Sequence, residues 1–343
     1  MAEFFMQYGL FLAKTTTILI AILIVLGVGF MMSKKSRALE KLEIKRLNDK
    51  FDSMRKILRA STLPKKEYKK FIKRQKSEAK AKEKQRAEDS PRKRFFVLEF
   101  RGDIKATAVA SLREEVTAVL TMATPEDGVL LRLENTGGIV HEHGLAASQL
   151  QRFRDKNIPL TVAVDKVAAS GGYMMACVAD RILAAPFAII GSIGVLAQLP
   201  NFHDLLARHG IEFEQETAGE FKRTITMFGR NTDAERAKLR EQLEDTHQLF
   251  KDFVAEHRPN VNLKDVATGE YWHGIRALER NLVDELVTSD DFLLAASDDC
   301  DIYEVTYSAK KTVTERLMSS VQLGLVGWAD TIKDRVYRRR LLG

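Results

Sequence analysis

Residues 165–180, DKVAASGGYMMACVAD, decide how the rest of the chain is interpreted. An apolar run at 160–164 leads into this stretch, and its small residues predict a tight turn followed by a helix that begins near Ser170. A serine hydroxyl at a helix start lies beside backbone N–H groups and the positive end of the helix dipole, which suits a nucleophile next to an oxyanion. Serine is also a preferred N-cap residue, so this stretch alone favours capping over catalysis.

The sequence around this stretch predicts an α/β domain. Its apolar patterns indicate strands at 95–100, 129–133 and 160–164, separated by helices at 109–122 and at about 142–155. Such alternation is typical of a parallel sheet. One glycine-bearing loop, Thr136-Gly137-Gly138, follows the second strand, and Ser170-Gly171-Gly172 follows the third. Loops that leave parallel strands share one edge of the sheet, so the two glycine pairs are expected to form one site.

The later part of the chain continues the pattern with shorter elements. Residues 182–199 are apolar but are broken by Pro186 and by glycines, which favours buried sheet over a membrane span. A short helix at about 202–209 and a strand at 213–217 are expected next. Thr232 and Glu235 have the spacing of a capping box and predict a long helix that ends near residue 257. The tail at 312–342 has the pattern of an amphipathic helix, suited to an oligomer contact or a membrane interface.

The N-terminal region carries the signature of a membrane anchor. Residues 15–32 are an uncharged, largely apolar run of 18 residues, about the length that spans a bilayer core. The charged residues that follow indicate a stop rather than a signal-peptide cleavage site. Because the C-terminal flank of this run is the more basic, the positive-inside rule places the rest of the chain in the cytoplasm.

A basic arm follows the predicted anchor. Residues 33–95 hold 24 Lys and Arg against 9 Asp and Glu, a net charge of +15, so the rest of the chain carries −8 of the overall +7. Apolar residues from Ile44 to Leu58 are spaced as in a helix. The segment after Pro64 has few apolar residues, which predicts a solvated helix or a disordered linker. No aromatic interleaving or known binding fold supports nucleic-acid binding. Contact with anionic lipid headgroups and a plain solvated spacer both remain open.

A serine nucleophile requires a base, and the sequence offers histidine and lysine. None of the seven histidines has a recognisable local signature, and the spacing in His141-Glu142-His143 does not suit two metal ligands on one helix face. Lys222 lies just beyond a predicted strand among apolar neighbours, where a desolvated neutral amine could accept a proton. Most lysines are exposed, so this pattern alone is weak. Cys177 and Cys300 indicate neither a disulfide framework nor a metal site, and Cys177 is expected in the core.

Four motifs occur together in a fixed order: Asn135-Thr136-Gly137-Gly138, Ala169-Ser170-Gly171-Gly172-Tyr173, Gly191-Ser192-Ile193-Gly194-Val195 and Gly219-Glu220-Phe221-Lys222. This combination resembles the signal peptide peptidase A family, and its SohB branch in particular, over about residues 95–290. The resemblance implies a ClpP/crotonase-like α/β spiral fold, no cofactor or metal, peptide or protein substrates and a homo-oligomer.

The resemblance also implies roles for individual residues. Ser170 would be the nucleophile, Lys222 the general base, and Ser192 the residue that orients the lysine amine. The oxyanion hole would be formed by backbone N–H groups at Gly137, Gly138 and Gly171. The first loop, Asn-Thr-Gly-Gly-Ile, departs from the Ser-Pro-Gly-Gly-Gly common in the family, which leaves the choice of oxyanion donor open. Residues 271–274 and 282–285 resemble a downstream segment of the family and are interpreted as structural.

The chain is accordingly expected to have four parts: an anchor at 1–32, a basic helical arm at 33–94, a peptidase domain at 95–290 and a C-terminal strand and helix at 291–343. The expected function is a membrane-anchored serine endopeptidase with a Ser-Lys dyad, acting on remnant signal peptides or membrane-associated polypeptides. A crotonase-like acyl-CoA enzyme and a non-catalytic membrane adaptor are the alternatives. The resemblance implies the bacterial inner membrane with a periplasmic catalytic domain, against the cytoplasmic side that the flanking charges favour.

Overall fold

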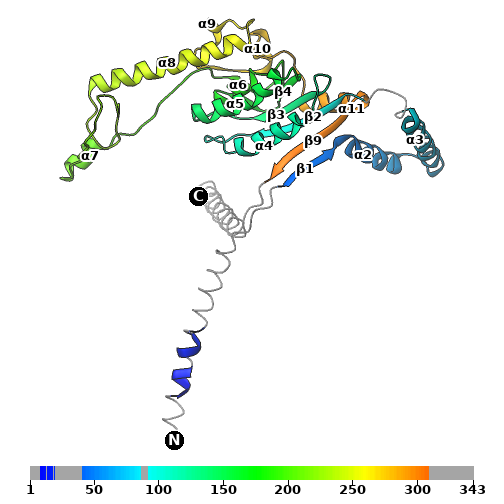
Figure 1. Cartoon of the computed structure of the whole chain (residues 1–343), viewed down its shortest axis with the longest axis horizontal. Helices are drawn as coiled ribbons and strands as arrows, with labels where there is room; N and C mark the ends of the chain where they lie inside the picture. The colour runs from blue at the N-terminus through cyan, green and yellow to red at the C-terminus, as the bar shows by residue number, and fades with distance from the viewer. Residues whose placement is uncertain (1–7, 13, 18, 20–40, 86–91, 309–343) are drawn as a thin grey trace, which may run out of the picture. The chain divides into compact units, whose positions relative to one another are not determined.

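The computed structural model describes residues 8–12, 14–17, 19, 41–85 and 92–308 (Figure 1). The chain divides into two compact units, Leu42–Tyr307 and a second unit formed by residues 1–41 with 308–343. In the second unit, the described residues between 8 and 19 are helical. Among the described residues, none of the helices combines the length and apolar character that a bilayer crossing requires. Most of the predicted anchor run, and the whole predicted helix at 312–342, lie outside the described residues.

A six-stranded sheet forms the centre of the larger unit. In spatial order its strands are β1 (Lys41–Arg46), β9 (Asp301–Ser308), β2 (Arg94–Arg101), β3 (Gly128–Glu134), β4 (Leu160–Val164) and β6 (Arg181–Ala184). The strands from β9 to β6 are paired in parallel. Every residue of β4 is buried, as expected for a parallel strand covered on both faces. The predictions of a mixed α/β fold with a parallel sheet, and of its three first strands, are confirmed.

Helices cover both faces of this sheet. On one face, α4 (Val109–Leu120), α5 (Val140–Asp155) and α6 (Gly171–Ala176) bury the larger apolar core. On the other face, α2 (Leu47–Thr62) and α11 (Ser289–Asp299) pack Leu47 and Leu293 against a smaller cluster that includes Leu130. Each fully buried Leu contributes about 1.5–3 kcal/mol through removal of apolar surface from water. Cys177 is fully buried in the larger core, as predicted.

A second, three-stranded sheet lies next to the first. It consists of β5 (Val167–Ala169), β7 (Ile189–Gly191) and β8 (Tyr271–His273), with β5 and β7 parallel and β7 and β8 antiparallel. The remaining helices are α3 (Lys65–Gln85), α7 (His203–Arg208), α8 (Asp233–His257), α9 (Leu263–Val266) and α10 (Gly274–Glu279). The predicted capping box is confirmed, because Thr232 and Glu235 exchange side-chain and backbone hydrogen bonds at the start of α8.

Two local predictions are wrong. Residues 213–217 do not form a strand, because Phe213 is the one large apolar side chain among them and it packs on Phe228, with 5.7 Å between ring centroids. Ile44 does not begin a helix. It lies in β1, which pairs with β9, and the helix begins only at Leu47. Of the two predictions for the segment after Pro64, a solvated helix or a disordered linker, the structure shows the helix from Lys65 to Gln85.

The segment around Asp284 has the structural role expected of it. The Asp284 carboxylate accepts two hydrogen bonds from Arg258, at 2.7 and 2.9 Å, and one from the backbone N–H of Ile182 at 2.7 Å. Burial opposes ionisation of this carboxyl, but the bonds from Arg258 and Ile182 outweigh it and hold the pKa of Asp284 below its usual value. The buried Tyr173 hydroxyl donates to the Leu282 carbonyl at 3.0 Å. These bonds fasten α6 and β6 to the segment that follows α10.

Glu115 on α4 supplies a pH-dependent test of the fold. Its side chain is buried, and burial raises its pKa to about 7, although its carboxylate accepts a 2.8 Å hydrogen bond from the Tyr307 N–H. A folded pKa above the unfolded one makes stability fall as pH rises between the two values. We expect Glu115→Gln to raise the free energy of unfolding at pH 8 by up to about 3 kcal/mol and to change it little at pH 5. Urea titrations at both pH values measure this, and an equal effect at both would contradict it.

Candidate active site

Ser170 lies where β5 ends and α6 begins. Its backbone has a positive φ of 53°, which non-glycine residues adopt rarely and at a cost of about 1–3 kcal/mol. Two backbone hydrogen bonds hold this conformation: Ser170 N–H donates to the Gly191 carbonyl at 2.7 Å, and Met174 N–H donates to the Ser170 carbonyl at 3.0 Å. Ser170 occupies the N-cap position, but its side chain makes no capping hydrogen bond. The hydroxyl is therefore not committed to the helix end.

The first glycine loop packs directly against Ser170. The two segments are joined by a parallel bridge between Asn135 and Ala168. A Cβ added to Gly137, whose φ is +87°, would lie 2.7 Å from the Ser170 Cβ, and one added to Gly138 would lie 2.2 Å from the Ile104 carbonyl oxygen. The backbone of this loop is thus as close to the serine as van der Waals contact allows, and it leaves no room for a side chain.

The three proposed oxyanion donors are not equivalent. Gly137 N–H donates to the Asn135 side-chain oxygen at 2.9 Å, so it is already engaged. Within the described part of the chain, the N–H groups of Gly138 and Gly171 have no acceptor. Gly171 is the first residue of α6, where the backbone N–H groups have no partner inside the helix. Of the three candidate donors, the N–H groups of Gly138 and Gly171 are therefore the ones without an acceptor among the described residues.

Ser192 lies at the same sheet edge as Ser170. Strands β5 and β7 are parallel with Ala169 opposite Gly191, so Ser170 and Ser192 leave neighbouring strands at the same level. Both serines have the same positive φ of 53°. The Ser192 N–H donates to the Glu270 carbonyl at 2.7 Å. Among the described residues, the one bond of the Ser192 hydroxyl is a long one of 3.4 Å to the Gly269 carbonyl. The structure thus brings these two sequence-predicted residues together.

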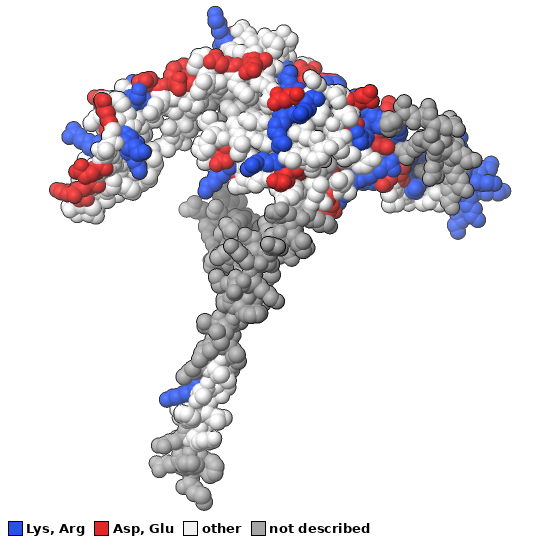
Figure 2. Space-filling view, viewed as in Figure 1, with Lys and Arg blue, Asp and Glu red and all other residues white. Residues whose placement is uncertain are grey.

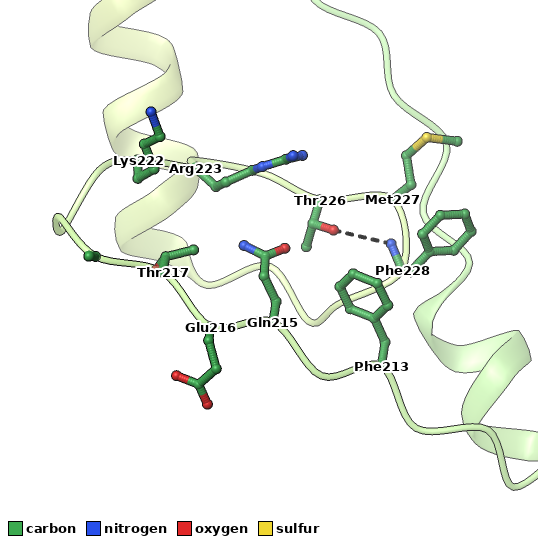
Figure 3. Close-up of a pocket in the computed structure, with 10 residues that line it drawn as sticks. Phe213, Gln215, Glu216, Thr217, Lys222, Arg223, Thr226, Met227 and Phe228 are labelled. Carbon is green, nitrogen blue, oxygen red and sulfur yellow. Dashed lines mark hydrogen bonds between the residues drawn. The ribbon is translucent and has the colours of Figure 1, made fainter.

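Lys222 lies elsewhere, in a segment without helix or strand between α7 and α8. Its side chain is exposed and lines a cavity of about 690 Å³ whose walls all come from residues 213–228 (Figure 3). In Figure 3 its amine points away from the rings of Phe213 and Phe228. No hydrogen bond joins Lys222 to Ser170 or Ser192 among the residues that the structure describes. The structure therefore assembles the serines and glycines of the predicted site without the predicted base.

Two buried polar side chains beneath the site were not predicted as functional. The sequence assigns Asn135 no role beyond opening a motif, and it offers His143 only as one of seven candidate bases without a local signature and as an unsuitable metal ligand. In the structure both are buried, and His143 Nε2 lies 3.3 Å from the Asn135 side-chain oxygen. The sequence contained one signal for such a role of His143. It follows the glycine loop by five residues and lies within the apolar pattern of a helix.

Comparison with known proteins shows the family of the chain. The chain matches two family models, described as Peptidase family S49 N-terminal over residues 3–150 and Peptidase family S49 over residues 152–302. It is 47% identical over 320 residues to the probable protease SohB of Haemophilus influenzae, covering 90% of each chain. The chain belongs to peptidase family S49. It is also 54% identical over 230 residues to the probable protease SohB of Buchnera aphidicola subsp. Acyrthosiphon pisum, covering 67% of this chain and 68% of the relative.

S49 membership confirms the resemblance drawn from the four motifs and shows that the protein is a serine peptidase. The acyl-CoA enzyme and adaptor alternatives are set aside by it. A solved structure of a mutant of the 1510-N membrane-bound stomatin-specific protease, in complex with a substrate peptide, is also similar. It has 12% sequence identity and a TM-score of 0.41, covering 68% of this chain and 99% of that one.

Proposed function

We propose that this S49 peptidase hydrolyses peptide bonds with a Ser-Lys dyad, in which Ser170 is the nucleophile and Lys222 the general base. The observation that carries the proposal is the environment of Ser170. Its side chain makes no capping hydrogen bond, and its backbone is held at a positive φ. Among the described residues no acceptor is recorded for the N–H of Gly171, the next residue, or for that of Gly138, in the loop that packs against Ser170. This is what a serine nucleophile and its oxyanion hole require. We propose the same ClpP/crotonase-like fold for this domain as the motifs implied.

The proposed reaction proceeds in two balanced steps. The neutral Lys222 amine takes the proton of the Ser170 hydroxyl as its oxygen attacks the substrate carbonyl carbon. The resulting oxyanion accepts hydrogen bonds from the Gly138 and Gly171 N–H groups. The C–N bond breaks, the departing amine takes the proton from Lys222, and the acyl group remains on Ser170. Water then attacks the ester while Lys222 accepts a proton from it. As the C–O bond to Ser170 breaks, Lys222 returns that proton to the serine oxygen, and the peptide acid leaves.

The proposal requires Lys222 to come within hydrogen-bond distance of Ser170. Lys222 lies in the irregular segment after α7, which is held to itself by bonds such as Asn201 Nδ2 to the Thr226 carbonyl at 3.0 Å. A shift of this segment, or a second copy of the chain in the expected homo-oligomer, would supply the amine. Ser192, at the level of Ser170 on the neighbouring strand, is well placed to orient that amine once it arrives.

We further propose that the protein acts at the bacterial inner membrane, with a single anchor at its N-terminus and its catalytic domain in the periplasm. The substrates would be remnant signal peptides or other membrane-associated polypeptides. Helices α2 and α3 support a lipid-facing role: Lys and Arg gather on this end of the unit (Figure 2), and α2 exposes Met54, Ile57 and Leu58. Basic residues beside exposed apolar ones suit an anionic lipid surface.

One labelling experiment tests both the nucleophile and the side of the membrane. We expect an acylating, serine-directed probe to modify the wild-type protein at Ser170 and to leave Ser170→Ala unlabelled. Mass spectrometry of the tryptic peptides identifies the modified residue. In spheroplasts, a membrane-impermeant form of the probe should label a periplasmic domain. Labelling at another serine would contradict the assignment of Ser170, and labelling only after lysis would place the domain in the cytoplasm.

A further inference from the structure

Helix α2 carries an apolar stripe that the domain covers along only half of its length. Leu47 and Phe51 belong to this stripe and pack into the smaller core cluster. Met54 and Leu58 continue it with the same alternating spacing of three and four residues, and they are 50% and 65% exposed. The stripe has the period of a helix face that packs against something apolar. Its second half nevertheless faces solvent in the part of the chain that the structure describes.

Ile57 widens this uncovered half into a patch. It is 66% exposed and lies three residues after Met54, so the two side chains are neighbours on the helix surface. We call Met54, Ile57 and Leu58 the outer patch of α2. Single exposed apolar residues are ordinary on a protein surface, whereas contiguous ones mark a surface that contacts another apolar partner.

Basic residues surround the outer patch. Arg55, Lys56 and Arg59 lie between and directly after its members, and all three are exposed. Residues 47–85, which form α2 and α3, hold 14 Lys and Arg against 5 Asp and Glu, a net charge of +9. An apolar helix face that is flanked by Lys and Arg is typical of a helix that lies in a membrane interface.

The charge of this region also decides between two occupants of the patch. A second copy of α2 and α3 would bring another net charge of +9 against the first, so like-charge repulsion opposes a contact between the two. Anionic lipid headgroups attract the same charges. The predicted anchor run ends at residue 32, nine residues before β1 begins at Lys41, and nine residues span at most about 32 Å. A bilayer that holds the anchor is therefore within reach of the domain.

We propose that the outer patch of α2 inserts into the interface of an anionic bilayer and forms a second membrane attachment beside the anchor. The apolar side chains of the patch lie at the boundary of headgroups and acyl chains, while Lys56 and its basic neighbours contact the headgroups. This assigns insertion to one face of one helix and makes it depend on anionic lipid. The inference rests on the proposed function, because the proposed anchor is what brings the bilayer near.

A fluorescent label at position 57 tests the insertion in the full-length protein. Ile57→Cys is labelled with an environment-sensitive dye in a Cys300→Ser background, where the remaining Cys177 is fully buried. The protein is reconstituted into vesicles of phosphatidylcholine, either alone or mixed with anionic phosphatidylglycerol. With the anionic lipid we expect the emission to shift to shorter wavelength and quenching by acrylamide to fall about 3-fold or more, because a side chain in the interface is shielded from water. The same label on Ser148→Cys, exposed on α5, should respond equally in both vesicles.

A charge reversal beside the patch tests the contribution of the lipid charge. Lys56→Glu should remove most of the protection from acrylamide that anionic vesicles give the label at position 57, because it replaces an attraction to the headgroups with a repulsion. Lys156→Glu is the matched control, since Lys156 is an exposed lysine at the C-cap of α5, outside α2 and α3. It should leave the protection unchanged.

Three results would overturn the inference. The first is equal quenching at position 57 in the two kinds of vesicle, and the second is an equal effect of Lys56→Glu and Lys156→Glu. The third is protection that also appears in lipid-free detergent micelles and grows with protein concentration, which would assign the patch to a contact between copies of the chain. Release of the protein from vesicles by alkaline carbonate would instead overturn the proposed anchor, so the two failures are distinguishable.

Discussion

Lys222→Ala is expected to lower kcat for peptide hydrolysis by about 10⁴-fold or more while leaving the folded structure unchanged. Removal of one member of a nucleophile–base pair costs about as much as removal of the pair, because neither acts without the other. Lys222 is exposed, so its truncation removes no core packing. Initial rates with a fluorogenic peptide, together with thermal unfolding, measure both effects. A variant that is folded and hydrolyses peptide at near the wild-type rate would show that Lys222 is not the base.

Arg223→Ala is the matched control for this prediction. Arg223 is the next residue, is also exposed and lines the same cavity as Lys222, so it shares the position and the positive charge but has no proposed role. Its loss should leave kcat within about 3-fold of wild type, as for most surface substitutions. A similar fall in both variants would indicate that charge or loop structure matters there, rather than a base.

A mixing experiment distinguishes the two routes by which Lys222 could reach Ser170. Ser170→Ala and Lys222→Ala are each expected to be inactive alone. If the lysine comes from a second copy of the chain, co-assembled variants regain part of the activity, because some sites contain both an intact serine and an intact lysine. If the segment between α7 and α8 folds back onto its own chain, each site lacks one residue and the mixture stays inactive.

The sequence was informative where short-range chemistry determines the structure. Apolar runs such as 160–164 predicted buried parallel strands. The two glycine pairs lie next to each other as expected, but the second follows β5, a strand of the second sheet, rather than the third strand of the main sheet. The register of β5 against β7 then places Ser192 beside Ser170. A serine in an ordinary turn and a serine that lies next to a nucleophile have the same appearance in a sequence. The motif around Ser192 alone therefore could not establish this proximity.

Contacts between distant segments were what the sequence could not supply. Ile44 has helical spacing with the residues that follow it. Its strand, β1, nevertheless pairs with β9, which is about 260 residues away in the chain. The Asn135–His143 pair needs the loop between its members to fold back before the two side chains meet. The position of Lys222 depends on how residues 213–228 pack on themselves, for which apolar periodicity contains no signal.

Gly137→Ala is expected to lower kcat by at least about 10²-fold, because it disturbs the surface against which Ser170 is held. The new methyl group would lie 2.7 Å from the Ser170 Cβ and 2.8 Å from both the Ala169 carbonyl oxygen and the Gly171 nitrogen. None of these atoms belongs to a flexible side-chain end, so the serine, the loop or the start of α6 must shift. Displacements of about 1 Å at reacting groups cost about 10²-fold in rate. The φ of +87° adds backbone strain, since alanine rarely adopts it.

Gly144→Ala provides the control for this substitution. Gly144 lies in α5, seven residues along the chain, and a Cβ added there meets nothing within 4 Å. The same chemical change should leave kcat unaltered and stabilise the helix by up to about 1 kcal/mol. Kinetics and urea unfolding of both variants separate lost catalysis from lost stability. Near-normal hydrolysis by a folded Gly137→Ala protein would mean that the first glycine loop does not form part of the reacting site. We expect the change in kcat to be much larger for Gly137→Ala than for Gly144→Ala, because Gly137 lies in contact with Ser170 and Gly144 does not.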